Sequence, residues 1–246
     1  MYKVSGVAEL LNCLVRKMKH IIFVFSALLI FSCEKERIVQ LPEIDYTSIT
    51  EVNDLLAAYI FYDEAPVPDN VDFNRKNLIS TTNWLVNVDK RLTLSQSIPQ
   101  IMLLQEKRRS AQMHKNENAK NYFTCNDTSR KTLGFIDFTE VVYHKESSGS
   151  YISTIPDLND TKNIKSLSFN LDNTVTIIDS SRDPYISVFT KRELINDLKK
   201  MDTINYTILL NFDKNLSFQD YVTYKSMLLK SNFENLKISN QEFLRN

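Results

Sequence analysis

Cys125 is the residue nearest to a catalytic nucleophile in this sequence, and the imidazoles that could activate it are those of His114 and His144. A thiol beside a positioned imidazole can serve as a hydrolase nucleophile, because the thiolate is the reactive form. The surrounding segment 123–127 matches no nucleophile motif, and a partly buried structural cysteine is the commoner case. We therefore expect no catalytic residue, and an envelope hydrolase that uses Cys125 with His114 or His144 is the alternative.

Metal, phosphate and nucleic-acid chemistry find no support in the sequence. No H-E-x-x-H or C-x-x-C spacing occurs, and Asp63, Glu64 and Asp69 are interrupted by prolines in a spacing that fits no calcium loop. The three glycines are too scattered for a phosphate-binding loop. Equal numbers of basic and acidic residues, 30 of each, remove the electrostatic basis for binding nucleic acid. We expect no metal, no cofactor and no nucleic-acid partner.

The N-terminal region carries a targeting segment. Basic residues lead into the apolar segment 21–31, which is too short for the roughly 20 residues of a membrane-spanning helix. A basic region followed by a short apolar run is typical of a secretory signal peptide. The ending Ile-Phe-Ser-Cys at 30–33 resembles a bacterial lipobox, in which the cysteine is acylated and becomes the first residue of the mature chain. Cys33 is the predicted lipidation site; the alternatives are a signal anchor and a buried core helix.

This assignment predicts where the protein lies. Residues 1–32 are the predicted signal peptide, whose start is either Met1 or, with 1–17 an over-extended start, Met18, which would open a normal signal sequence. Residues 33–50 form a polar tether, and its charged beginning is similar to the export signals of some Bacteroidota lipoproteins. We expect a lipoprotein of the cell envelope, periplasmic or surface-exposed, whose lipid anchor makes the membrane its first partner.

The apolar content of 43% and the length of 246 residues suit one large domain or two domains of about 100 residues. In the first half, alternation of apolar residues predicts a strand at 84–88 and a strand or hairpin at 134–143. Helical spacing predicts a helix that Ser95 caps. We expect a first α/β module at 51–146.

A small-residue segment, Ser147-Ser-Gly-Ser, predicts a linker at 147–160 before a second module at 161–246. The expected elements of that module are a hairpin at 167–178, a helix at 190–201, a strand at 206–212, a helix from Ser217 to about 230 and a strand at 236–238. Their order is β-β-α-β-α-β, with the helices on one face of the sheet. The predicted fold class is α+β, with two small α/β sandwich modules.

The two halves contain an internal repeat. A shift of 124 positions places the segment from Trp84 over the segment from Ile208, with these identical pairs: Leu85/Leu209, Asn87/Asn211, Asp89/Asp213, Lys90/Lys214 and Leu92/Leu216. The pattern predicts a strand, a turn and a capped helix in each half. An aspartate at the strand end can accept backbone N–H groups of the turn, so Asp89 and Asp213 are predicted structural residues. Chance similarity in an Asn- and Lys-rich sequence is the alternative.

The stretch 167–244 resembles the periplasmic domain of the ExbD/TolR family. The family pattern is a strand hairpin, a helix, a strand ending in aspartate (here Asp213), an aromatic residue (here Tyr221) in a second helix, and a final strand. The resemblance implies a dimerising interaction module that works beside a membrane, in a motor complex driven by proton flow. Segment 21–31 lacks the intramembrane aspartate of that family, so a direct part in proton conduction is not expected.

Taken together, these expectations describe a lipid-anchored, non-enzymatic envelope protein. Its partners would be an envelope protein or the cell wall. The family resemblance also implies a second copy of the chain, in a homodimer. Its work would be that of an accessory to an ExbD/TolR-type energy-transduction or transport complex.

Overall fold

The structure is a computed structural model, and it forms two separate units. One unit spans residues 1–38 and contains the predicted signal peptide and Cys33, and the other spans residues 39–246 and is compact. The residues that the structure describes are Arg16, Met18, 37–63, 71–75, 78–111, 116–156, 163–179 and 185–245. Cys33 and the rest of the predicted signal peptide therefore lie outside the described residues. Among the described helices, none is long and apolar enough to cross a membrane.

The first sheet packs under one long helix. Its strands are β1 (Glu43–Ile44), β2 (Leu55–Phe61), β3 (Asp72–Asn74), β4 (Asn83–Val88), β5 (Asn121–Asp127) and β6 (Thr132–Asp137). They follow the order β1-β5-β4-β2-β3, and β6 also pairs with β5. The helix α2 (Leu94–Arg109) shares a hydrophobic cluster with β4 and β5. β4 is apolar on both faces because it lies between two parallel neighbours.

The second sheet has helices on both faces. Its strands are β7 (Val142–His144), β8 (Ile164–Phe169), β9 (Thr174–Asp179), β10 (Tyr185–Thr190), β11 (Tyr206–Asp213) and β12 (Leu236–Arg245), in the order β10-β9-β8-β11-β12-β7. Helices α5 (Leu194–Met201) and α6 (Phe218–Ser231) pack on the face that contains Leu210. The short helix α3 (Ser148–Ser153) packs on the opposite face, against Leu209.

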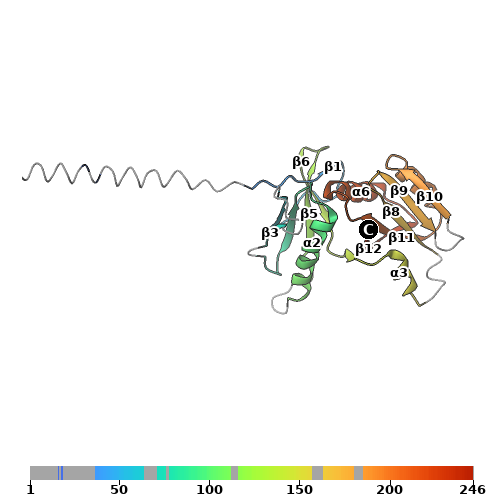
Figure 1. The fold of residues 1–246 in the computed structure, drawn as a ribbon, viewed down its shortest axis with the longest axis horizontal. Helices are drawn as coiled ribbons and strands as arrows, with labels where there is room; N and C mark the ends of the chain where they lie inside the picture. Colours follow the sequence, from blue (N-terminus) through green and yellow to red (C-terminus); the bar gives the residue numbers. More distant parts are fainter. Residues whose placement is uncertain are drawn as a thin grey trace, which may run out of the picture. The chain divides into compact units, whose positions relative to one another are not determined.

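These two six-stranded sheets and their helices confirm the predicted α+β fold with two sheet modules. Both helices that were predicted for the second module, α5 and α6, lie on one face of its sheet. Strand β10 is an addition that the sequence analysis did not predict, so the observed order is β-β-β-α-β-α-β (Figure 1). The last strand is also longer than predicted, because β12 continues beyond a register shift to Arg245.

The predicted strand–turn–helix unit occurs in both halves, which confirms that part of the repeat. Val86 and Leu210 lie in central strands and are fully buried, as expected for equivalent positions. The correspondence extends to neighbouring strands. The order β3-β2-β4-β5 matches β9-β8-β11-β12, with the same parallel and antiparallel directions throughout.

The two strand–turn–helix segments contact each other at equivalent positions. Thr93 and Ser217, which the shift of 124 superposes, pair directly in an antiparallel bridge. The bonds around them are reciprocal. The Leu94 N–H donates to the Leu216 carbonyl at 2.9 Å, and the equivalent Phe218 N–H donates to the Leu92 carbonyl at 2.7 Å. The same reciprocity joins Ser95 to Lys214 and Gln219 to Lys90, at 2.8 and 3.1 Å. The two junction segments are therefore related by a local two-fold axis, as are the contact segments of a symmetric dimer.

Helix caps and module boundaries differ in part from the prediction. α2 begins after Thr93 rather than after Ser95, because the Gln96 side chain accepts the Thr93 N–H at 3.0 Å; Thr93 is also the residue equivalent to the observed and predicted cap Ser217. β1 lies inside the predicted tether and pairs with β5. Segment 134–143 is no hairpin: β6 joins the first sheet, and β7 crosses to the edge of β12 in the second. The chain therefore passes between sheets near Val141, where its N–H closes a turn on Phe138.

The predicted linker 147–160 contains a packed helix. α3 occupies its first part, where Ser148 is buried and its hydroxyl lies 3.1 Å from that of Ser166. Tyr151 and Ile152 pack against the second sheet because the face around Leu209 would otherwise be exposed apolar surface. Residues 157–160 lie outside the described part of the chain.

Candidate binding site

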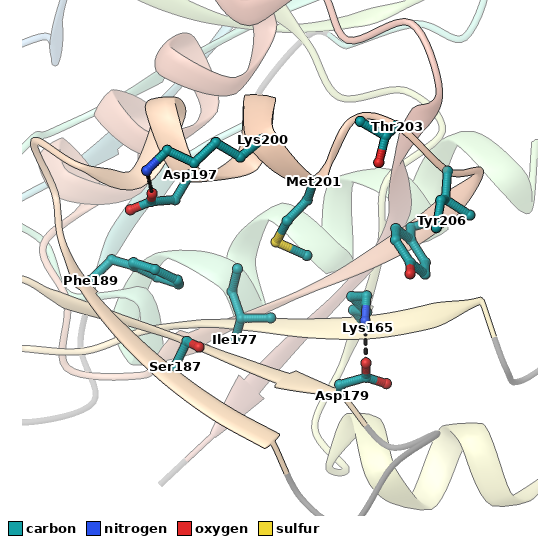
Figure 2. A pocket seen from close by; sticks show the side chains of 11 residues that line it. Lys165, Ile177, Asp179, Ser187, Phe189, Asp197, Lys200, Met201, Thr203 and Tyr206 are labelled. Atoms are coloured by element: carbon teal, nitrogen blue, oxygen red, sulfur yellow. Dashed lines mark hydrogen bonds and ion pairs between the residues drawn. The ribbon is translucent and has the colours of Figure 1, made fainter.

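A pocket that could hold a ligand lies between α5 and the second sheet. Its volume is about 410 Å³, and Ser187 and Phe189 of β10 are among the residues that line it (Figure 2). Its lining residues come from four strands, from α5 and from the loop that follows α5: Lys165, Ile177, Asp179, Ser187, Phe189, Asp197, Lys200, Met201, Thr203, Ile204 and Tyr206. Because α5 is short, it leaves this end of the sheet uncovered.

A buried ion pair lies at the floor of the pocket. Lys165 of β8 and Asp179 of β9 are direct cross-strand neighbours, and their side chains are joined by a hydrogen bond (Figure 2). The two side chains are only 6% and 9% exposed. The Lys165 ammonium also lies 4.3 Å from the centre of the Tyr206 ring, a cation–π distance. Burying this pair costs desolvation free energy that an apolar pair would not cost, so stability alone does not account for it.

The walls of the pocket are apolar and its rim is charged. Ile177, Phe189 and Met201 provide the walls, and the Lys200 ammonium bonds the Asp197 carboxylate at 2.6 Å on the rim. Both charged pairs are therefore neutralised within the protein. The arrangement suits an uncharged, largely apolar group that fills the space between α5 and β10.

The predicted structural aspartates both lie at strand ends, and both bond the following turn. Asp89 follows β4 and accepts the Arg91 and Gln40 N–H groups, each at 3.1 Å, and it accepts two further bonds from the Arg91 guanidinium. Asp213 ends β11 and accepts the Asn215 N–H at 2.9 Å. Burial would raise the pKa of Asp89, but the bonds from Arg91 and Gln40 outweigh it and lower that pKa.

The identical asparagines of the repeat also make equivalent bonds. The Asn87 amide donates to the Ala58 carbonyl at 3.1 Å, and the Asn211 amide donates to the Leu167 carbonyl at 3.5 Å. Ala58 and Leu167 occupy corresponding positions on β2 and β8, because they pair with the equivalent residues of β4 and β11. The Asn-x-Asp sequence therefore serves the fold in both modules and brings no reactive group into the pocket.

Cys125 and His144, two residues of the hydrolase alternative, lie in different sheets. Cys125 lies in β5, it is fully buried, and desolvation raises the pKa of its thiol. His144 lies in β7, in the other sheet, where its Nε2 is 2.6 Å from the Gln241 side chain and its ring stacks on Phe243. His114 lies outside the described residues. Among the described residues, no three His, Cys, Asp or Glu side chains gather as metal ligands.

Sequence reasoning missed Lys165, Asp179 and β10. The predicted hairpin around 172–174 contained a signal for the first two, because Lys165 and Asp179 are opposite charges at equal distances from its turn. A signal for β10 is also present, because its six residues are rich in aromatic and β-branched side chains, which favour a strand.

Comparison with known proteins adds no identification. No protein-family model matches the chain, and neither a curated protein nor a solved structure is significantly similar to it.

Proposed function

We propose that the protein is a lipid-anchored, non-enzymatic envelope protein, held by acylated Cys33, that works by protein–protein interaction as an accessory of an ExbD/TolR-type complex. The observation that carries this proposal is the element order of the second module. A hairpin (β8, β9) is followed by a helix (α5), a strand ending in Asp213 (β11), a helix with Tyr221 (α6) and a last strand (β12). That order agrees with the family pattern, into which β10 is inserted.

The contacts of the chemically reactive side chains also support an interaction role. Cys125 is buried, His144 is engaged with Gln241 and Phe243, and Asp89 and Asp213 hold turns. Each therefore has a structural task that accounts for its position. An accessory role, rather than proton conduction itself, follows from the absence of an acidic residue in segment 21–31.

The proposal is tested in the native envelope. Cells that carry the tagged full-length protein are labelled with palmitate and crosslinked, and the recovered proteins are identified by mass spectrometry. We expect palmitate on the wild-type protein and ExbD/TolR-type motor subunits among the crosslinked partners. The Cys33→Ala variant should lose palmitate and recover less of these subunits, because it is no longer held at the membrane.

Two results would contradict the proposal. Palmitate on the Cys33→Ala variant would show that the anchor is elsewhere, and crosslinked partners without any motor subunit would refute the accessory role. The Cys125→Ala variant serves as a control, since it removes the thiol of the hydrolase alternative and should leave the partners unchanged.

A further inference from the structure

The edge strand β10 is a free sheet edge without the usual protection. It pairs with β9 on one side and ends the strand order, and in the described part of the chain nothing pairs with its other side. Natural proteins protect such edges with charged residues, proline, bulges or short strands. β10 has six residues, Tyr-Ile-Ser-Val-Phe-Thr, with no charge, proline or glycine, and it is paired to β9 without a bulge.

Both faces of β10 present contact surface for a neighbouring strand. Ile186 and Val188 are 58% and 62% exposed on the face away from α5. Ser187 and Phe189 point to the other face and line the pocket. A strand that paired with β10 would therefore cover the exposed isoleucine and valine with one set of alternate side chains. The other set would lie beside Phe189 at the mouth of the pocket.

In the residues of the first module that the structure describes, this surface has no counterpart. Its sheet ends at β3, which has only three residues and begins with Asp72. The connection from β3 to β4 contains no helix or strand in its described residues, whereas the connection from β9 to β11 contains both β10 and α5. The junction around Thr93 and Ser217, moreover, already joins the two modules within one chain. A second copy therefore cannot use that junction, whereas β10, which ends the second sheet, is open to a different partner.

We propose that β10 is a strand-addition site for an extended peptide segment of the envelope partner, with one apolar side chain of that segment inserted into the pocket under α5. The proposal rests on the proposed function and specifies how the partner is bound. A small molecule in the pocket would leave Ile186 and Val188 exposed, whereas an added strand covers them and also satisfies the free backbone groups of β10.

The charges near β10 define the peptide further. Lys165 and Asp179 neutralise each other at the pocket floor, so the inserted side chain is uncharged. Lys191 and Arg192 directly follow β10. Lys191 lies 3.8 Å from Asp220, while Arg192 is exposed, and the nearby Glu193 carboxylate accepts the Thr190 N–H. The segment should therefore be an apolar stretch with alternating contacts, followed or preceded by an acidic residue that faces Arg192.

The test begins with site-specific photocrosslinking in the native envelope. A photoreactive phenylalanine analogue replaces Val188 in one variant and Leu229 in the other. Leu229 is the matched control, since it is 52% exposed but lies on α6. The crosslinked peptide from the Val188 variant is sequenced by mass spectrometry. We expect one apolar, extended segment with a flanking acidic residue, and we expect it to be absent from the Leu229 sample.

That segment is then synthesised and titrated into the purified protein. Val188→Lys and Ile186→Lys should each weaken binding by about tenfold or more, because a charge is placed in the paired edge, while Leu229→Lys should bind as the wild type does. Hydrogen exchange should show protection of β10 amides only in the complex. Thermal melting checks that the variants fold, which the exposure of the replaced side chains leads us to expect.

Any of three results would overturn the proposal. The Val188 variant could crosslink to lipid or to a second copy, the Leu229 variant could give the same crosslinks as the Val188 variant, or the segment could bind without protecting the β10 amides. The proposed function fails separately. Recovery of motor subunits by a Val188→Lys variant as efficient as the wild type would refute strand addition and leave the accessory role in place. A bound segment from an unrelated envelope protein would refute the accessory role and leave strand addition at β10 in place.

Discussion

The first module ends its sheet at a three-residue strand with an aspartate, whereas the second ends its sheet at six uncharged residues. In the interior the two modules agree closely: Asn87 and Asn211 make the same bond, and Asp89 and Asp213 hold the same turn. The strand–turn–helix unit is therefore retained for stability and for joining the modules. The edges, where the modules differ, are the places where function can vary without loss of the shared core.

A second difference lies inside the sheets. Lys165 of β8 is opposite Ile208, and the corresponding residue of β2, opposite Trp84, is Leu56. An apolar residue thus occupies in the first module the position that carries a buried charge in the second. The β-strand framework tolerates either residue, so the ion pair belongs to the pocket of the second module rather than to the fold.

The largest expected effects concern the junction, where Leu94 and Phe218 are equivalent and fully buried. Leu94→Ala should lower the free energy of unfolding by about 2–5 kcal/mol and Phe218→Ala by about 3–5 kcal/mol. Because both residues belong to one hydrophobic cluster, each variant should unfold in one transition in urea. Fluorescence of Trp84, the single tryptophan, should give the same midpoint as circular dichroism. Separate midpoints would show that the modules unfold independently.

The buried ion pair tests the difference between the sheets. Asp179→Leu leaves the Lys165 ammonium buried without this partner and should cost about 3 kcal/mol in urea unfolding. The double variant Lys165→Leu, Asp179→Leu gives the second module the type of residue that the first has at Leu56. Its stability should be close to that of the wild type. A double variant as unstable as the single one would show that the pair itself holds the sheet.

The two turn aspartates should differ in their effect. Asp89→Ala removes the acceptor of the Gln40 and Arg91 bonds and should cost about 2–3 kcal/mol. Asp213→Ala removes one turn bond and should cost about 1 kcal/mol, as for the loss of a helix cap. Lys237→Ala, an exposed control in β12, should stay within about 0.5 kcal/mol. Urea unfolding of the three variants provides the ranking, and a larger cost at Asp213 would contradict it.

The pH dependence of stability should also report the bonds of Asp89, with a smaller effect than the alanine substitution. The pKa of Asp89 is lowered in the folded state, so its contribution is complete above the unfolded pKa of about 4 and is lost as the pH falls through the folded value. Asp89→Asn should therefore show a smaller loss of stability than the wild type on going from about pH 5 to about pH 2. Parallel curves for the two proteins would show that Asp89 is not the group that titrates.

The smallest effect is expected at Cys125, because its thiol is buried and its pKa is raised by desolvation. In the folded protein, a maleimide should leave the peptide that contains Cys125 unlabelled in mass spectrometry, and in urea it should label that peptide fully. Rapid labelling of the folded protein would favour the hydrolase alternative.

The sequence was sufficient for the elements whose signals are local. The alternation at 84–88, the aspartates after the strands and the Ser217 cap each depend on neighbours within a few positions, and the structure confirms them. The predictions that failed concern pairing over longer distances. Segment 134–143 was expected to be one strand or hairpin, but its two strands join different sheets. The predicted linker instead contains α3, which covers an apolar face.

The sequence by itself determined the repeated strand–turn–helix unit, because residue spacing, the Asn-x-Asp motif and the caps act within each segment. Only the tertiary structure decided that the two units meet around Thr93 and Ser217 and that β10 forms the free edge of the second sheet. It also decided that Lys165 and Asp179 form a buried pair beneath α5. The physical reason is that a strand satisfies its backbone groups through partners elsewhere in the chain, and the free energy of each pairing depends on what those partners bury.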